Sequence, residues 1–184
     1  MKRLSALRFR IDTLCLLSLV LACLALPLAA APVAAAEKYA ALVIDANTGE
    51  TLHERYADAS RFPASLTKIM TLYVLFEDLQ SGRFKLDSPL SVSANAAAQA
   101  PSKVNVKAGS TIKVEDAIQA LTTKSANDVS VVVAENVGGS VSGFAARMNR
   151  TARALGMNST TFRNPNGLPD PKQVTTARDL AKLA

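Results

Sequence analysis

A serine and a lysine stand three residues apart at the start of an apolar run. Residues 63–71 read PASLTKIMT, which places Ser65 and Lys68 at that spacing. In a helix, residues i and i+3 lie on one face, with Cβ atoms about 5–6 Å apart. A serine hydroxyl attacks a carbonyl carbon when a neutral amine takes its proton, and burial lowers the pKa of a lysine. The pair is therefore a candidate nucleophile and general base for acyl transfer.

Two simpler roles are open for this pair: Ser65 caps the helix, and Lys68 extends its amine to water. The same spacing occurs again at Ser110 and Lys113. There, polar and apolar residues alternate, which predicts a strand. Residues three apart in a strand point to opposite faces of the sheet, so we exclude the second pair.

The pattern Ser-x-Asn also occurs twice. Ser93 and Asn95 follow a short predicted strand, whereas Ser125 and Asn127 lie in a tight connection between two apolar helices. A loop held by two packed helices places its side chains reproducibly, so we select Ser125 and Asn127 as further candidates. The simpler alternative is that one of them caps the following helix.

Other reactive residue types are scarce. His53 is the only histidine, and both cysteines, Cys15 and Cys23, lie in the first 36 residues. One histidine excludes a metal site with two histidines and argues against a Ser-His-Asp triad, and we expect His53 to be a solvated surface residue. The chain after residue 36 has no disulfide and no thiolate nucleophile. We expect no metal or other cofactor.

Residues 1–36 have the pattern of a secretory signal peptide. A basic start precedes an apolar stretch at residues 11–28, and Ala34–Ala36 forms a small-residue cleavage site. A retained membrane anchor is the alternative. Export with an alanine-rich leader indicates the periplasm or cell envelope of a bacterium.

The basic character of the chain belongs partly to this leader. Of 21 basic and 15 acidic side chains, four and one lie in residues 1–36, which leaves 17 against 14. A mildly positive surface is weak evidence for an anionic polymer as partner. No arginine-rich stripe or nucleic-acid motif occurs, so we expect no nucleic acid partner. Residues 37–184 suffice for one domain with a core.

The predicted elements are a hairpin followed mostly by helices. Strands at 39–45 and 51–56 flank a turn. The run at 64–80 predicts a helix that is apolar over most of its circumference, is buried in the body of the domain and ends near Gly82. A two-stranded hairpin is rarely stable alone, and the chain stops inside a helical pattern, so we expect an N-terminal fragment. Further short strands and helices are expected at 86–92, 102–114, 114–122, 128–137, 142–155 and from 177.

The sequence resembles the serine-type D-alanyl-D-alanine carboxypeptidases, low-molecular-mass penicillin-binding proteins related to the serine β-lactamases. The resemblance covers residues 38–184 and implies an α+β (α/β sandwich) fold of the β-lactamase/DD-peptidase type. In such a fold the N-terminal hairpin and helical subdomain are completed by C-terminal sheet strands, which are missing here. The motifs that carry it are Asp45 with Thr48-Gly49, residues 63–71, residues 125–128, Met148-Asn149, Leu155-Gly156-Met157, Thr161-Phe162, Asn164, Gly167-Leu168 and residues 176–180.

The resemblance implies a role for each candidate residue. Ser65 attacks the carbonyl of the penultimate D-alanine in a peptidoglycan stem peptide, and Lys68 takes its proton. Ser125 helps to pass a proton to the departing D-alanine, and water then hydrolyses the acyl-enzyme. Asn127 hydrogen-bonds the bound peptide and helps to orient Lys68. β-Lactam antibiotics would acylate the same serine, and membrane attachment is left open.

One departure from the family pattern concerns its third motif, Lys-Thr-Gly, which is absent from these 184 residues. We therefore expect the domain at residues 37–184 to be truncated, and the fragment alone to be inactive and unstable. The nearest rival is a serine β-lactamase, for which Glu135, the last glutamate, follows Ser125 too closely. A rival from another class is a non-catalytic envelope protein that binds peptidoglycan.

Overall fold

The computed structural model describes residues 38–184 as two small sheets and a group of helices. β1 (Ala41–Ile44) pairs antiparallel with β2 (Thr51–Arg55), and β3 (Pro89–Ser91) pairs with β4 (Thr111–Lys113). This confirms the predicted α+β class and the N-terminal hairpin, while the signal peptide predicted for residues 1–36 lies outside the described part. The helical elements are η1 (Ala64–Leu66), α2 (Thr67–Gln80), α3 (Ala94–Ala97), α4 (Val114–Gln119), η2 (Ala120–Lys124), α5 (Asn127–Gly138), α6 (Val141–Ala154) and α7 (Ala177–Leu183).

The turn of the first hairpin is built by Asp45. Its carboxylate accepts hydrogen bonds from the backbone N–H groups of Asn47 and Thr48, both at 2.8 Å. Gly49 then takes a φ of +74°, which a residue without Cβ adopts freely. These contacts hold the pKa of Asp45 below its usual value. The sequence signals for the turn therefore act locally, as expected of an Asx turn.

The helix predicted for residues 64–80 forms, but its burial was predicted wrongly. Met70, Val74 and Leu75 are fully buried, whereas Ile69 and Phe76 keep 38% and 47% of their surface exposed. The opposite face of α2 is thus apolar and open within residues 38–184. Gly82, with a φ of +74°, follows the helix as predicted.

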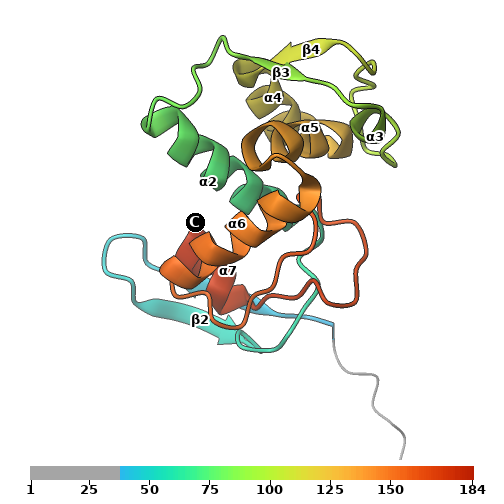
Figure 1. Ribbon diagram of the computed structural model, residues 1–184. Helices are drawn as coiled ribbons and strands as arrows, with labels where there is room; N and C mark the ends of the chain where they lie inside the picture. Colours follow the sequence, from blue (N-terminus) through green and yellow to red (C-terminus); the bar gives the residue numbers. More distant parts are fainter. Residues whose placement is uncertain (1–37) are drawn as a thin grey trace, which may run out of the picture. The chain divides into compact units, whose positions relative to one another are not determined.

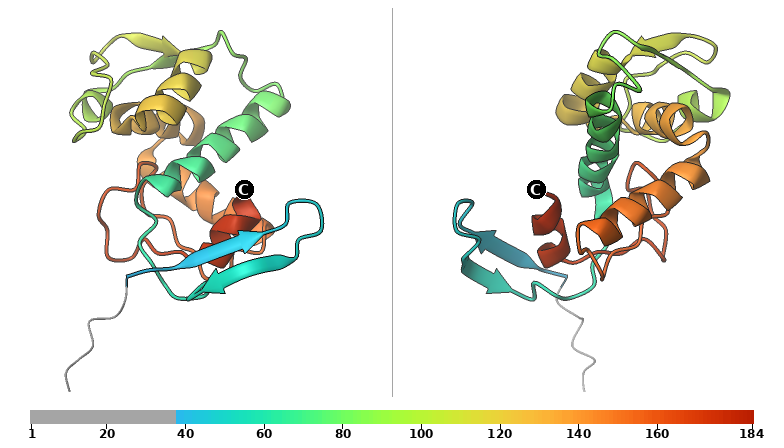
Figure 2. Two further views of the ribbon diagram at one scale, coloured as in Figure 1. Left: turned by 180° about the vertical axis from the view of Figure 1, so that it is seen from behind. Right: turned by 60° about the vertical axis from the view of Figure 1, so that its left-hand side comes forward.

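α5 lies at the centre of the core, against α2, α3, α6 and β3 (Figures 1 and 2). Nine of its 12 residues are buried. Gly138 permits the tight turn into α6, because a Cβ there would lie 2.6 Å from Phe144. Within residues 38–184 no single helix is long and apolar enough to cross a membrane, although α5 and α6, bent by 81°, pass together on length and composition.

α7 packs against β1 in the lower half of Figure 1. A bridge between Arg61 and Thr175, with both N···O distances at 2.8 Å, ties the chain that enters η1 to the chain that enters α7. Because residues 161–175 lie between α6 and α7, this bridge brings their loop beside the start of α2.

Candidate active site

Ser65 lies on η1, the single 3-10 turn that runs directly into α2. Its side chain is exposed and caps neither helix, so the capping alternative fails. Within residues 38–184 its hydroxyl has no hydrogen-bond partner, Lys68 included. Contacts between nucleophile and base in unliganded sites are often long and tighten when substrate binds.

Lys68 is buried, with 3% of its surface exposed, so it does not extend to water. Its Nζ donates to the side-chain Oδ1 of Asn127 at 2.8 Å and to the backbone oxygen of Asn166 at 2.7 Å. Burial lowers the pKa of Lys68 from 10.5 to about 8, and no carboxylate offsets it. A neutral amine has two N–H groups and one lone pair. The two carbonyl oxygens therefore take both N–H groups and leave the lone pair free.

Asn127 is the first residue of α5, and its amide is held from both ends. While its oxygen accepts from Lys68, its Nδ2 donates to the backbone oxygens of Ala100 and Pro101, at 3.1 and 3.0 Å. This pattern fixes which end of the amide is oxygen. The geometry fits the orienting role expected for Asn127. Both amide hydrogens are already used inside the protein, so only the second lone pair of Oδ1 is left for a substrate.

Ser125 occupies the connection between η2, a π-helical turn, and α5. Its φ is +53°, in the left-handed region that non-glycine residues rarely adopt, and its side chain is half-buried. Neither Ser125 nor Asn127 caps α5 through its side chain. Tyr56, Ala64 and Asn105 are the other described non-glycine residues with positive φ. Ala64 directly precedes Ser65. The backbone is therefore strained at Ser125 itself and at the residue before Ser65, as is common at functional sites.

Asp128 is a contributor that the sequence reasoning did not select. Its side chain is fully buried and accepts from the backbone N–H groups of Val104 and Val106, at 3.3 and 3.2 Å. The carboxylate thereby fastens the 100–106 segment beside Asn127. The signal was present in the sequence, because Asp128 ends the same four-residue motif.

The loop at residues 164–168, in which Asn164 and Gly167-Leu168 carry part of the family resemblance, also reaches the site. Besides the Asn166 oxygen on Lys68, the Pro165 oxygen accepts from Thr71 Oγ1 on α2 at 2.7 Å. Gln173, also buried, accepts from the N–H groups of Arg163 and Asn164 at 2.8 and 2.9 Å. The contacts with Lys68 and Thr71 are made by the backbone oxygens of Asn166 and Pro165, so residue type alone did not reveal them.

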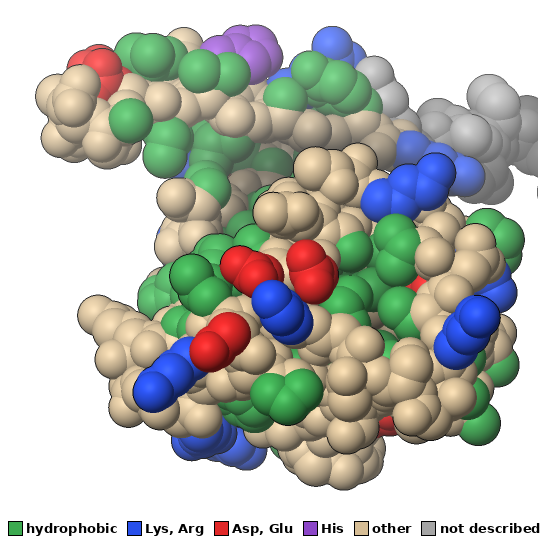
Figure 3. All heavy atoms as spheres, turned by 90° about the horizontal axis from the view of Figure 1, so that it is seen from above, with side chains coloured by type: hydrophobic (Ala, Val, Ile, Leu, Met, Phe, Trp, Pro, Cys, Tyr) green, Lys and Arg blue, Asp and Glu red, His purple; other side chains and the backbone are tan. Residues whose placement is uncertain are grey.

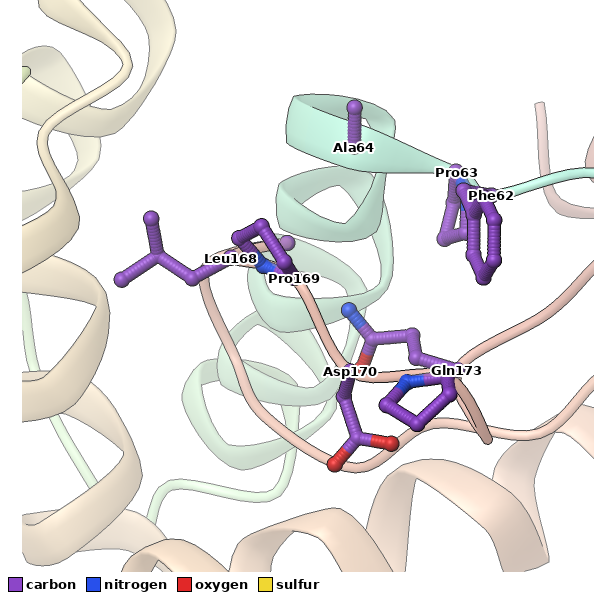
Figure 4. A pocket seen from close by; sticks show the side chains of 9 residues that line it. Phe62, Pro63, Ala64, Leu168, Pro169, Asp170 and Gln173 are labelled. Atoms are coloured by element: carbon purple, nitrogen blue, oxygen red, sulfur yellow. The ribbon is translucent and has the colours of Figure 1, made fainter.

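A cavity of about 420 Å³ lies between residues 62–64, at the start of η1, and the loop at residues 167–173. Its wall is largely apolar, with Asp170 and Gln173 as the polar members. Figure 4 shows Phe62, Pro63 and Ala64 at the start of the helix and Leu168, Pro169, Asp170 and Gln173 on the loop that faces them. The cavity therefore borders the turn of the candidate nucleophile.

The patterns that we excluded lie elsewhere in the fold. Ser110 precedes β4, and Lys113 ends that strand with a bond to Glu115. Ser93 caps α3 through its side chain. His53 is exposed on β2, the one histidine on the surface in Figure 3. Glu135 bonds Asn95.

No group of three or more His, Cys, Asp or Glu side chains within residues 38–184 is placed to hold a metal ion. The site itself presents the Ser65 hydroxyl, the Lys68 amine of lowered pKa and the oriented amide of Asn127.

Known proteins are similar to this chain in sequence and fold. The family model of the D-alanyl-D-alanine carboxypeptidases matches residues 28–184. The D-alanyl-D-alanine carboxypeptidase DacC of Escherichia coli is 37% identical over 150 residues, which cover 78% of this chain and 38% of that protein.

Two solved structures agree with this. The D-alanyl-D-alanine carboxypeptidase DacD from Francisella tularensis has a TM-score of 0.78 and 41% identity, over 80% of this chain and 36% of that one. Penicillin binding protein 5 from Haemophilus influenzae has a TM-score of 0.75 and 31% identity, over 78% of this chain and 43% of that one. The chain thus spans well under half the length of these relatives. It belongs to the D-alanyl-D-alanine carboxypeptidase family.

Proposed function

We propose that the protein is a serine-type D-alanyl-D-alanine carboxypeptidase that trims peptidoglycan stem peptides through an acyl-enzyme at Ser65. The observation that supports this most is Lys68. Its amine is buried one turn after an exposed serine, and fixed carbonyl oxygens take the two N–H groups of its neutral form. The lone pair is left to accept the serine proton.

The reaction follows from that arrangement. Lys68 Nζ accepts the hydroxyl proton as Ser65 Oγ bonds to the carbonyl carbon of the penultimate D-alanine. The backbone N–H of Ser65, at the start of η1, stabilises the oxyanion. The C–N bond then breaks, and the proton on Lys68 reaches the nitrogen of the departing D-alanine through the Ser125 hydroxyl, which leaves Lys68 neutral. Water then attacks the ester at Ser65 while Lys68 takes a proton from it, and Lys68 returns that proton to Ser65 Oγ as the C–O bond breaks.

β-Lactams are expected to use the same site. Opening of the ring by Ser65 leaves the amine tethered to the acyl group, so the leaving group does not diffuse away. The carboxypeptidase relatives are bacterial proteins, and one structural relative is a penicillin binding protein by name. We place the protein in the bacterial envelope, with the peptidoglycan stem peptide as substrate.

Covalent labelling of the complete gene product tests the proposal. After incubation with penicillin, peptide mass spectrometry should find the adduct on Ser65, and the unlabelled enzyme should release D-alanine from a stem pentapeptide. Ser65→Ala should abolish both. Ser110→Ala, at the other Ser-x-x-Lys match, is the matched control and should change neither.

The two rival functions give different results in the same assay. Fast loss of the adduct with turnover of penicillin, and no D-alanine release, would identify a β-lactamase. No adduct at all would identify a binding protein and overturn the proposal.

A further inference from the structure

Gly167 packs directly against the peptide group that joins Ala64 to Ser65. A Cβ placed on Gly167 would lie 1.9 Å from the Ala64 oxygen, 2.3 Å from its carbonyl carbon and 3.0 Å from the Ser65 nitrogen. Its φ of +85° is also one that side chains rarely adopt. Of the described glycines with positive φ, only Gly167 has any atom within 4 Å of this position.

The residues just before Gly167 hold the other reactive group. The Asn166 oxygen accepts from Lys68 Nζ at 2.7 Å, and the Pro165 oxygen accepts from Thr71 on α2 at 2.7 Å. The Gly167 N–H in turn donates to the Asn164 side chain at 2.8 Å, which stiffens the loop. Three consecutive residues therefore touch the nucleophile's turn, the base and Thr71, which follows the base on α2.

We propose that Gly167 is a positioning residue that sets the Ser65 backbone against Lys68, with residues 165–167 acting as one rigid spacer. This inference rests on the proposed function, because it assigns Gly167 to the same acylation step. Gly167 touches no reacting atom; it acts through the peptide that carries the Ser65 Cα and N–H.

The size of the effect follows from the contact distances. Because Cβ atoms essentially never approach another atom closer than 3.0 Å, an alanine at 167 requires the Ala64 oxygen at 1.9 Å to move by more than 1 Å. Ala64 is already in the left-handed region, at φ +48°, so its peptide has few other orientations. Misplacing a reacting group by 1 Å costs about 100-fold in rate.

The test is the acylation of the complete gene product by penicillin, resolved into the non-covalent dissociation constant and the acylation rate constant by saturation kinetics. Gly167→Ala should lower the acylation rate constant by about 100-fold and leave the dissociation constant within about threefold. Gly156→Ala is the matched control. It has a φ of +75° and similar burial, with nothing within 4 Å of its Cβ position, and it should acylate at the wild-type rate.

Each outcome is decisive. Equal rates for Gly167→Ala and Gly156→Ala, whether both normal or both reduced, overturn the inference, because both positions have a positive φ and only Gly167 contacts the Ala64–Ser65 peptide. A rise in the dissociation constant alone also overturns it. If wild-type protein is not labelled, the proposed function has failed and the inference falls with it.

A milder variant decides the case in which Gly167→Ala gives no cooperative thermal transition. Thr71→Val keeps the side-chain shape but removes the hydrogen bond to the Pro165 oxygen. It should lower the acylation rate constant by about tenfold, since the spacer loses one of its attachments to α2. Thr151→Val, a buried threonine on α6, is its control. An unchanged rate in Thr71→Val overturns the inference.

Discussion

The acylation of Ser65 by penicillin should follow the ionisation of Lys68. Burial lowers the pKa of Lys68 from 10.5 to about 8, and only the neutral amine accepts the serine proton. The acylation rate should therefore rise tenfold per pH unit below pH 7 and level off above pH 9. The neutral fraction is about 1% at pH 6, about 9% at pH 7 and about 90% at pH 9, so the rate should rise about 90-fold from pH 6 to pH 9.

A lysine of ordinary pKa would behave differently. Its neutral fraction would rise about 1000-fold from pH 6 to pH 9 with no plateau, and at pH 7 it would be about 300-fold smaller than that of Lys68. That factor is the gain that burial supplies near neutral pH. It is obtained because burial lowers the pKa of Lys68 and no carboxylate within residues 38–184 lies beside the amine to raise it again.

Fluorescent penicillin at subsaturating concentration gives the second-order rate constant at each pH, with Ser65→Ala protein as background. Protein returned from pH 9 to pH 7 should label at the original pH 7 rate, which excludes denaturation. A rate that still rises tenfold between pH 8 and pH 9 would refute the lowered pKa. A rate that is level from pH 6 to pH 9 would show that Lys68 is not the base.

Stability supplies a second measure of the same ionisation. Lys68 loses its proton at about pH 8 in the folded protein and at about 10.5 when unfolded. Between these values the unfolded state binds more protons, so the free energy of unfolding should rise with pH, by about 3 kcal/mol in all. Urea denaturation at pH 7 to 10.5 should show this rise in wild-type protein relative to Lys68→Met, which lacks the amine.

One further substitution tests the surroundings of Lys68, and two test the ion pairs of Asp78 near the end of α2. Asn127→Leu removes the oxygen that holds Lys68, so penicillin labelling should slow by about 100-fold. The free energy of unfolding, measured by urea denaturation, should fall by about 2 kcal/mol because backbone oxygens are left unpaired. Labelling at the wild-type rate would contradict the orienting role. Arg147→Met leaves the carboxylate of Asp78, 1% exposed, without its 2.6 Å partner, and urea denaturation should show a loss of about 3 kcal/mol. Arg83→Met, which removes a 58% exposed partner of the same carboxylate, should cost under about 1 kcal/mol, and equal losses would contradict this reasoning.

Local patterns predicted much of the fold because their causes are local. The turn after β1 forms through Asp45 and its neighbours, and Gly139 and Gly156 follow α5 and α6 with positive φ, as expected of helix ends. The predicted burial of α2 in the body of the domain failed for Ile69 and Phe76 for a different reason. Apolar composition indicates which residues can be buried, whereas burial depends on which other elements reach that face.

The sequence by itself identified Ser65, Lys68, Ser125 and Asn127 as candidates, because residue type and helical spacing limit which groups can act together. Only the tertiary structure brought Asn127 and the Asn166 oxygen to the amine, 59 and 98 residues from Lys68 along the chain. A lowered pKa is a property of surroundings, and the contact at Gly167 is made with backbone atoms. Residue types alone predict neither the lowered pKa nor this contact. Every residue carries the same backbone carbonyl, and the path of the whole chain decides where that carbonyl points.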